Sequence, residues 1–307
     1  MAQKIVATGY GAPREVLSIA DVEEPVPGPG QVVVEVRAAG LNPFDVKKVQ
    51  GAMGSDPSAL PLALGGEAAG VIRSADDDSG FAPGDEVVVY PASGAFAEFV
   101  SADTKNVHTK PSGAPFDAAA GLLLAGVTAF DTVATLGLGA DDTVLIHGGS
   151  GSVGSVAIVL AISRGARVIA TASPGNHEHV RDLGAVPVAY GDGLVDAVRS
   201  AAPSPVTAVI DTAGSDEAID ASLEFVEPAR IVSIAAFGRA DDGIVLLNGS
   251  SEQSKKNRSA AAEPLLTALA DGEISVDIAG SFAFADAADA FEALDGNHPR
   301  GKFILHP

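Results

Sequence analysis

Hydrophobic and polar residues alternate in the first third of the chain in a way that predicts β-strands. Over residues 31–37, Val32, Val34 and Val36 share one face of an extended segment, and polar residues occupy most of the other positions. A side-chain period of two is typical of a half-buried strand. The segment before it, residues 25–30, is rich in proline and glycine, and we interpret it as a rigid turn.

From about residue 117 the pattern changes to strands that alternate with helices. Residues 143–147 form a largely apolar run of the kind found in buried strands, and apolar residues then recur at helical spacing from Val153 to Arg164. Regular alternation of strand and helix predicts a parallel sheet with right-handed crossovers. The other elements expected in this part are strands at 167–171, 206–211 and 230–235 and a helix at 177–183.

The end of the chain, after about residue 254, is predicted to begin with a helix. A strand near 276–284, a helix over 286–294 and a final strand over 302–305 are expected to follow. The expected fold class is therefore α/β, in which a parallel sheet is combined with a β-rich region.

Composition narrows the class of protein. The chain has 307 residues, of which 47% are hydrophobic, so it can bury a large core. No apolar run reaches the roughly 20 residues that a membrane-spanning helix needs, and the first residues do not resemble a signal peptide. We therefore expect a cytoplasmic protein that does not bind membranes.

The net charge and the absence of cysteine argue against further classes of protein and of functional site. The net charge is −21, which disfavours binding to nucleic acid and which we attribute to solubility rather than to a functional acidic surface. The chain contains no cysteine, so disulfides, iron–sulfur clusters, cysteine nucleophiles and thiolate zinc sites are all excluded.

A glycine motif follows the strand predicted at 143–147. Gly149, Gly151 and Gly154 have the spacing G-x-G-x-x-G and lie directly between a strand and a helix. The pattern alone could mark a simple tight turn. In this context, however, it favours a dinucleotide site, because glycines let the backbone approach a pyrophosphate and the helix N-terminus supplies N–H groups.

The residues after the next strand bear on the choice of cofactor. Proteins that prefer NAD place a carboxylate at this position to bind the ribose 2′-hydroxyl, whereas here the strand ends at Ser173. Asn176, His177 and Arg181 follow and would suit a 2′-phosphate, so we expect NADPH. The alternative is that these three are ordinary helix residues, and acidic neighbours in the same helix weaken the argument.

Several segments together resemble the medium-chain dehydrogenase/reductase superfamily. These are residues 38–45, which read AAGLNPFD, residues 64–70, which read LGGEAAG, the glycine loop, and residues 301–305. The Asn-Pro-x-Asp element is similar to the zinc-free quinone oxidoreductase branch. The resemblance covers essentially the whole chain. It implies a β-rich GroES-like substrate domain at 1–118, a Rossmann domain with a doubly wound parallel sheet at 119–254, and a return to the substrate domain at 255–307, in a protein that forms homodimers.

The resemblance also implies that the chain holds no metal. Zinc-dependent members carry cysteine and histidine where this sequence has Asn42 and Gly66, and their four-cysteine lobe is missing after Tyr90. Without a Lewis acid, an alkoxide product is poorly stabilised. Quinones and α,β-unsaturated carbonyls (enones) delocalise the incoming charge themselves, so we expect these as substrates.

The resemblance assigns roles to individual residues. Asn42 would lie near the nicotinamide and donate from its amide to the substrate carbonyl, although it could be only a turn residue before proline. Asp45 would support that turn, and Thr128 would approach the nicotinamide. Lys302 would reach a phosphate or else lie on the surface. The remaining cofactor contacts expected are Gly149, Gly151, Ser152 and Val153 at the pyrophosphate, Tyr190 over the adenosine, and Ala235, Ala236 and Phe237 at the nicotinamide end.

No proton donor can be identified. Related enoyl reductases use a tyrosine after the Asn-Pro-x-Asp turn, but residues 47–53 contain none. This is tolerable for quinones, which water can protonate, and counts against fatty-acyl or polyketide enoyl thioesters, which remain the alternative substrates. A second alternative is a non-catalytic dinucleotide-binding sensor or structural protein. The sequence leaves the physiological acceptor, the stereochemistry and the strictness of the NADPH preference open.

Overall fold

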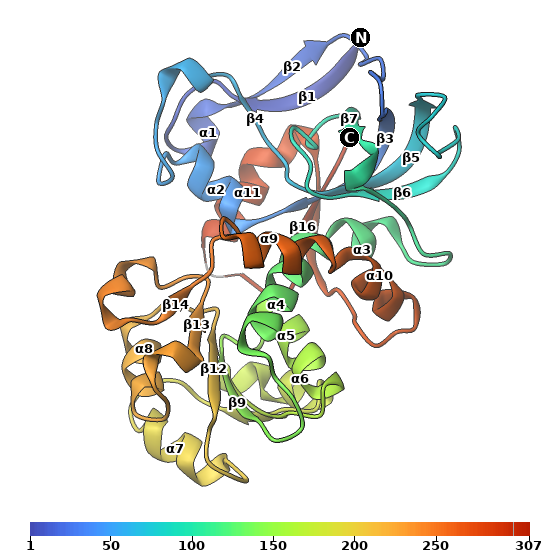
Figure 1. Cartoon of the computed structure of the whole chain (residues 1–307). Coiled ribbons are helices and arrows are strands. Elements are labelled where there is room, and N and C mark those ends of the chain that lie inside the picture. Colours follow the sequence, from blue (N-terminus) through green and yellow to red (C-terminus); the bar gives the residue numbers. More distant parts are fainter. Residues whose placement is uncertain (297) are drawn as a thin grey trace. The chain divides into compact units, whose positions relative to one another are not determined.

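The computed structural model describes residues 1–296 and 298–307 and contains two compact units (Figure 1). The first unit comprises Met1–Leu124 and Leu266–Pro307, and the second comprises Ala125–Leu265. The two boundaries fall inside the helices α4 (Leu123–Leu136) and α10 (Ala262–Ala270). The chain therefore leaves the first unit and re-enters it near its end.

The first unit is built mainly from antiparallel strands. A seven-stranded sheet has the order β15-β16-β3-β5-β6-β8, with β7 also paired to β3, and a smaller sheet has the order β2-β1-β4. The strands are β1 (Ala2–Ala7), β2 (Leu17–Val22), β3 (Gln31–Leu41), β4 (Leu62–Ala63), β5 (Ala68–Ala75), β6 (Glu86–Val89), β7 (Phe99–Asp103), β8 (Val107–Thr109), β15 (Ile278–Ala283) and β16 (Lys302–His306). The helices are α1 (Pro13–Val16), α2 (Pro43–Val49), α3 (Phe116–Ala120) and α11 (Ala287–Asp295).

Strand β3 is the centre of this unit. It pairs with β5, β7 and β16, and α3 packs against it. The strand was predicted over 31–37 with one face exposed, but it runs on to Leu41, and Val33 is as fully buried as Val32 and Val34. The predicted alternation is otherwise confirmed, because Gln31 and Glu35 are half-buried and Arg37 is exposed, and Val33 is the one departure from it within residues 31–37.

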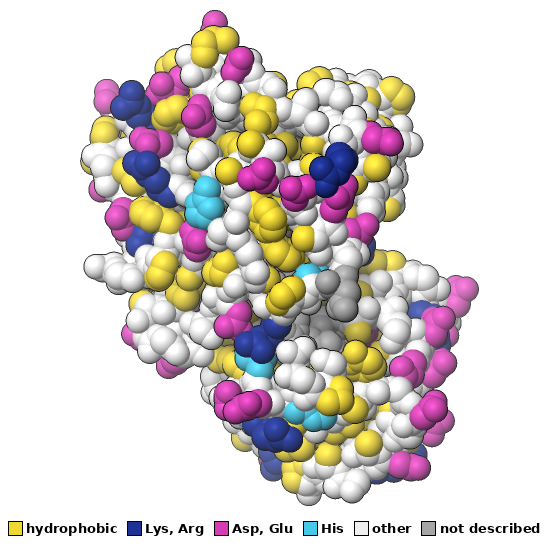
Figure 2. All heavy atoms as spheres, turned by 180° about the vertical axis from the view of Figure 1, so that it is seen from behind, with side chains coloured by type: hydrophobic (Ala, Val, Ile, Leu, Met, Phe, Trp, Pro, Cys, Tyr) yellow, Lys and Arg dark blue, Asp and Glu magenta, His cyan; other side chains and the backbone are white. Residues whose placement is uncertain are grey.

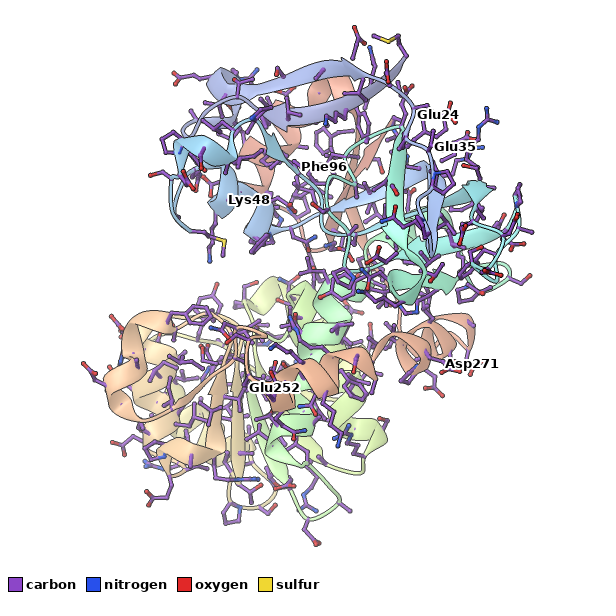
Figure 3. All side chains as sticks on the ribbon, turned by 45° about the horizontal axis from the view of Figure 1, so that its top comes forward. Glu24, Glu35, Lys48, Phe96, Glu252 and Asp271 are labelled. Carbon is purple, nitrogen blue, oxygen red and sulfur yellow. The ribbon has the colours of Figure 1, made fainter. Side chains whose placement is uncertain are left out.

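Aromatic packing stabilises the core of the first unit. Phe96 is fully buried and points into the interior (Figure 3). Its ring meets the ring of Phe291, from α11, edge to face, with centroids 6.1 Å apart. Because Phe291 belongs to the C-terminal segment, this contact joins the two separate stretches of chain that form the unit.

The second unit contains the predicted parallel sheet. Its six strands have the order β11-β10-β9-β12-β13-β14, and every pair is parallel. The chain winds outward from β9 in both directions, which confirms the doubly wound Rossmann fold. The strands are β9 (Thr143–His147), β10 (Arg167–Thr171), β11 (Val186–Val188), β12 (Ala208–Asp211), β13 (Ile231–Ser233) and β14 (Val245–Leu246). The helices are α5 (Ser152–Ser163), α6 (His177–Asp182), α7 (Leu194–Ala201), α8 (Asp216–Leu223) and α9 (Glu252–Ser259).

The second unit extends beyond residue 254, where we expected the chain to return to the substrate domain. Helix α9 stays with the second unit because buried Asp131, on α4, accepts hydrogen bonds from Ser254 and Asn257. The return falls at Leu266 instead. Periodicity could not show this, because α9 is held by polar contacts rather than by an apolar face.

Acidic side chains are spread over the surface rather than gathered in one patch on the face drawn in Figure 2. This distribution is consistent with a solubilising role for the net charge of −21. Within the described residues, every helix is too short or too polar to cross a bilayer.

Candidate functional site

The glycine loop follows β9 and leads into α5. A Cβ atom on Gly154 would lie 2.2 Å from the carbonyl oxygen of Gly148, and one on Gly149 would lie 2.6 Å from the Cβ of Ala170. Both positions therefore require glycine for packing. At Gly151 the nearest atom would be 3.4 Å away, so packing alone does not require glycine there. Gly151 is the N-cap of α5, where the first N–H groups lack intrahelical partners and can bind an anion.

A pocket of about 480 Å³ lies beside this loop, at the carboxyl ends of β9, β10 and β12. Ligands of open α/β sheets bind at this edge. The pocket is lined by His147, Gly148, Ser150, Thr171, Ala172, Ser173, Asn176, Tyr190, Leu194, Ala213, Ser215, Glu217 and Ala218.

Three of the predicted cofactor residues line this pocket, namely Ser173, Asn176 and Tyr190. The amide Nδ2 of Asn176 lies 3.2 Å from Ser173 Oγ and 3.4 Å from Ser150 Oγ. One wall of the pocket is therefore a group of hydroxyl and amide functions, which can bind ribose hydroxyls or phosphate oxygens without carrying a charge.

The two cationic candidates, His177 and Arg181, are not among the lining residues. His177 Nε2 lies 3.2 Å from the carbonyl oxygen of Ala172, and Arg181 is exposed on α6. For these two residues the alternative of ordinary helix positions fits the structure better than a phosphate contact. The helix begins at His177, and Arg181 follows one turn farther along it.

Two buried ionisable residues lie at the ends of strands that border the pocket. His147, the last residue of β9, bonds to Ser222 at 3.1 Å through Nε2, and burial lowers its pKa to about 4. Asp211 accepts hydrogen bonds from the backbone N–H groups of Ala213 and Gly214, both at 3.0 Å. These contacts shape the turn that leads to the pocket wall after β12. We did not predict either residue, and their only signal was an ionisable side chain at the end of a buried strand.

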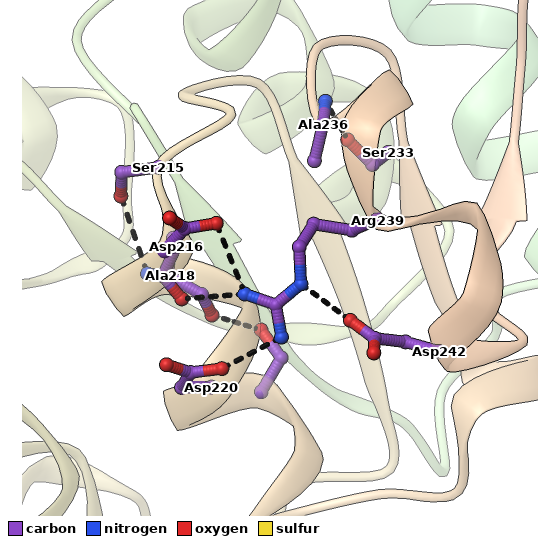
Figure 4. Close-up of polar contacts among 9 residues, drawn as sticks. Ser215, Asp216, Ala218, Asp220, Ser233, Ala236, Arg239 and Asp242 are labelled. Atoms are coloured by element: carbon purple, nitrogen blue, oxygen red, sulfur yellow. Dashed lines mark hydrogen bonds and ion pairs between the residues drawn. The ribbon is translucent and has the colours of Figure 1, made fainter.

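The loop after β13 carries the residues expected at the nicotinamide end. Ser233 Oγ accepts hydrogen bonds from the backbone N–H groups of Ala235 and Ala236 at 3.1 and 2.9 Å. Farther along the loop, the guanidinium of Arg239 binds three carboxylates, of which two belong to α8 and hold the loop to that helix (Figure 4). The loop is thus fixed at both ends, and Phe237 between them is 49% exposed. The three carboxylates belong to Asp216, Asp220 and Asp242.

A buried polar cluster lies in the first unit, around Asn42. Asn42 Nδ2 donates to Glu67 Oε1 at 2.9 Å and to the carbonyl oxygen of Gly40 at 3.2 Å, so both of its hydrogens have partners. Lys302 Nζ donates to Asn42 Oδ1 and to Glu67 Oε1, the latter at 3.0 Å. The Lys302 side chain is 5% exposed, so neither expectation for it, a phosphate contact or a surface position, is correct. Glu67 needs a buried cation, and Lys302 provides it.

Asp45 supports the turn at Asn42, as expected. Its carboxylate accepts hydrogen bonds from the backbone N–H groups of Asn42 at 3.0 Å and Gly65 at 3.3 Å. Burial raises the pKa of Asp45 to about 6. Asn42 is the N-cap of α2, which also makes it a turn residue before Pro43.

Thr128, the third predicted catalytic residue, belongs to the second unit. It lies in α4, and its hydroxyl accepts hydrogen bonds from Nη1 and Nη2 of Arg258 at 3.3 and 3.2 Å. Its approach to a nicotinamide stays a prediction. Across residues 1–296 and 298–307, no three histidine, aspartate or glutamate side chains are grouped to hold a metal ion.

Two protein-family models match the chain. Residues 28–112 match the alcohol dehydrogenase GroES-like domain, and residues 183–305 match the zinc-binding dehydrogenase family. The first match lies in the antiparallel unit and the second begins in the parallel one. The name of the second family refers to zinc binding, but this chain has no cysteine that could serve as a zinc ligand.

Individual proteins are similar over most or all of the chain. The NADPH-dependent alkenal/one oxidoreductase of Arabidopsis thaliana chloroplasts is 30% identical over 295 residues, which cover 90% of this chain and 72% of that protein. The crystal structure of a quinone oxidoreductase from Pseudomonas syringae is 30% identical, with a TM-score of 0.84 and complete coverage of both chains. A mycobacterial structure complexed with NADPH is 27% identical, with the same TM-score and complete coverage.

Proposed function

Because the chain belongs to the medium-chain dehydrogenase/reductase superfamily of oxidoreductases, we propose that it transfers hydride from NADPH to a quinone or an α,β-unsaturated carbonyl without zinc. The alkenal/one oxidoreductase and the quinone oxidoreductase to which it is similar support the substrate class. The name of the former and the NADPH-bound mycobacterial structure support the cofactor.

The observation that carries this proposal is the pocket beside the glycine loop. The backbone N–H groups of Ser152 and Val153, in the first turn of α5, would hold the pyrophosphate where Gly151 leaves room for it. Ser173 and Asn176 would hold the ribose and its 2′-phosphate through uncharged donors. When bound, the reduced nicotinamide supplies the hydride.

The chemistry of Asn42 and Gly66 supports the substrate class. These residues occupy the positions of two zinc ligands in zinc-dependent relatives, and neither side chain is a metal ligand of that kind. The Asn42 amide is instead held by Glu67, Gly40 and Lys302. Asn42 could donate a hydrogen bond to a substrate carbonyl only if it broke its present bond to Glu67 or to the carbonyl oxygen of Gly40. Acceptors that delocalise negative charge place the smallest demand on such a site.

Two measurements test the proposal. NADPH and NADH are titrated separately by the fluorescence of the reduced nicotinamide, which no tryptophan obscures because the chain has none. Quinones, enones and a crotonyl thioester are then compared as oxidants of NADPH, with and without a chelator. We expect tighter binding of NADPH, turnover with quinones or enones, little with the thioester, and no effect of the chelator.

A requirement for a divalent ion would contradict the zinc-free mechanism, and failure of both dinucleotides to bind would contradict the function itself. Binding without turnover of any acceptor would instead support the non-catalytic alternative. A homodimer in the cytoplasm stays a prediction, which light scattering and fractionation can check.

A further inference from the structure

The pocket beside the glycine loop has two chemically different sides. Ser173 and Asn176 follow β10, whereas Ser215, Glu217 and Ala218 follow β12. Because β10 and β12 flank β9 on opposite sides, these two groups reach the pocket from opposite directions. The β10 side offers hydroxyl and amide groups. The β12 side offers a carboxylate, and the side chains of Tyr190 and Leu194 add apolar surface to the pocket.

Glu217 is the one Asp, Glu, Lys or Arg among the described residues that line this pocket. Its Oε1 atom accepts a hydrogen bond from the backbone N–H of Gly191 at 2.6 Å. This contact fixes the carboxylate next to Tyr190, in the segment that borders the pocket, and leaves Oε2 to accept from another donor.

We propose that Glu217 selects the base of the dinucleotide by accepting a hydrogen bond from the exocyclic amino group of adenine. This inference rests on the proposed function, since it concerns the cofactor of that function. The Glu217 carboxylate repels the negatively charged dinucleotide and weakens its binding unless the dinucleotide places a hydrogen-bond donor against the carboxylate. The ring edge of adenine carries one donor group, its amino group, and in the proposed function Ser173 and Asn176, on the other side of the pocket, hold the ribose and its 2′-phosphate.

The proposal predicts discrimination between purines. Hypoxanthine carries a carbonyl oxygen in place of the amino group, and this oxygen would face the carboxylate of Glu217. Binding of NADPH is compared with binding of its hypoxanthine analogue by the fluorescence of the reduced nicotinamide. We expect the wild-type protein to bind the analogue about tenfold more weakly, the effect of losing one charge-assisted hydrogen bond at a partly exposed site.

The Glu217→Gln variant tests the residue itself. Glutamine keeps one oxygen for the N–H of Gly191 and replaces the other with an NH₂ donor, which suits the carbonyl of hypoxanthine. We expect the tenfold preference for adenine to fall to about one or to invert. Glu178→Gln is the matched control, because it removes the same charge from an exposed position on α6 outside the pocket lining. It should keep the wild-type preference.

Three results would overturn the inference. If the wild-type protein binds both dinucleotides equally, Glu217 does not read the base, and the proposed function still stands. If Glu217→Gln weakens both dinucleotides but keeps their ratio, the residue acts only by holding Gly191. If neither dinucleotide binds to the wild-type protein, the proposed function fails and the inference fails with it.

Discussion

Lys302 and Glu67 form a buried ion pair whose two members depend on each other. Their side chains are 5% and 0% exposed, so each charge has lost nearly all contact with water. Removing one member strands the other charge in the interior, which typically costs about 3–5 kcal/mol. Removing both charges leaves no unpaired charge in the interior, although Asn42 Oδ1 then loses the donor that Lys302 supplies.

Lys302→Met is therefore expected to lower the free energy of unfolding by about 3 kcal/mol or more, measured by urea denaturation. The double variant Lys302→Met with Glu67→Gln should recover part of this loss, because no unpaired carboxylate remains. A single variant as stable as the wild-type protein would show that Lys302 does not neutralise Glu67.

His147 makes the stability of the second unit depend on pH. Burial lowers its pKa from 6.5 to about 4, so the folded protein keeps the ring neutral while the unfolded chain protonates it. The contribution to stability is complete above pH 6.5 and is lost as the pH falls toward 4. The shift corresponds to roughly 3 kcal/mol over this window.

We expect the free energy of unfolding to fall more steeply between pH 7 and pH 4.5 in the wild-type protein than in His147→Asn. The comparison with a variant is needed because Asp45 acts in the opposite direction. Burial raises its pKa to about 6, so its contribution is complete below 3.8 and is lost as the pH rises through 6. Identical pH profiles for the two proteins would contradict the assignment.

Ser173 lines the pocket at the position where we propose that NADPH is distinguished from NADH. Ser173→Asp would place a carboxylate among Ser150 and Asn176, where the 2′-phosphate is proposed to bind. We expect a relative change of ~1–3 kcal/mol in favour of NADH, because the new charge repels the phosphate. Fluorescence titration of both dinucleotides measures it. An unchanged preference would mean that the phosphate binds elsewhere.

The turn between β9 and α5 contains two glycines that packing requires, Gly149 and Gly154, and one that packing does not require, Gly151, which we propose lies against the pyrophosphate. Gly154→Ala would force a Cβ atom to within 2.2 Å of a carbonyl oxygen, whereas Gly151→Ala would meet nothing closer than 3.4 Å. We expect Gly154→Ala to lose about 1–3 kcal/mol of stability. Gly151→Ala should fold normally but bind NADPH more weakly.

Thermal unfolding and dinucleotide titration separate the two effects. Gly139→Ala is the control, because a Cβ atom there would have no neighbour within 4 Å. Normal NADPH binding by Gly151→Ala would contradict the proposed approach of the pyrophosphate to this residue.

The sequence predicted some of these elements accurately because their signals are local. Strands β9 and β10 begin and end where their apolar runs do, at Thr143–His147 and Arg167–Thr171. The glycine loop between β9 and α5 was placed by its spacing. Ser173 and Asn176 were expected in the cofactor site because they follow β10, and Tyr190 was expected there from the family resemblance; all three line the pocket.

Other parts of the site could not be predicted, because they depend on which strands become neighbours. Glu217 reaches the pocket only because β12 lies beside β9, although these strands are far apart in the chain. Lys302 joins Asn42 only because β16 pairs with β3. The residues of these strands show no local sequence pattern that predicts which strand lies beside which.

At the scale of the whole molecule, the net charge of −21 opposes folding through repulsion between acidic groups. Salt screens this repulsion, since the Debye length falls from about 30 Å at 0.01 M to a few ångströms near 1 M. We expect the free energy of unfolding to rise by about 1–2 kcal/mol when sodium chloride is raised from about 0.01 M to about 0.5 M.

Chloride is preferred to sulfate for this experiment, because sulfate stabilises proteins by other means. Glucose at matched osmolality provides the uncharged control. A stability that falls with salt would show that favourable ion pairs outweigh the repulsion.

The interrupted first unit has a consequence for synthesis on the ribosome. Residues 125–265 form one continuous stretch and can fold as soon as they emerge, whereas residues 39–41 of β3 wait for β16, which is made much later, to pair with them. Until β16 emerges, the nascent polypeptide carries an unpaired stretch of sheet edge, a feature that favours aggregation. Chaperone demand should therefore be concentrated on the N-terminal segment of the first unit.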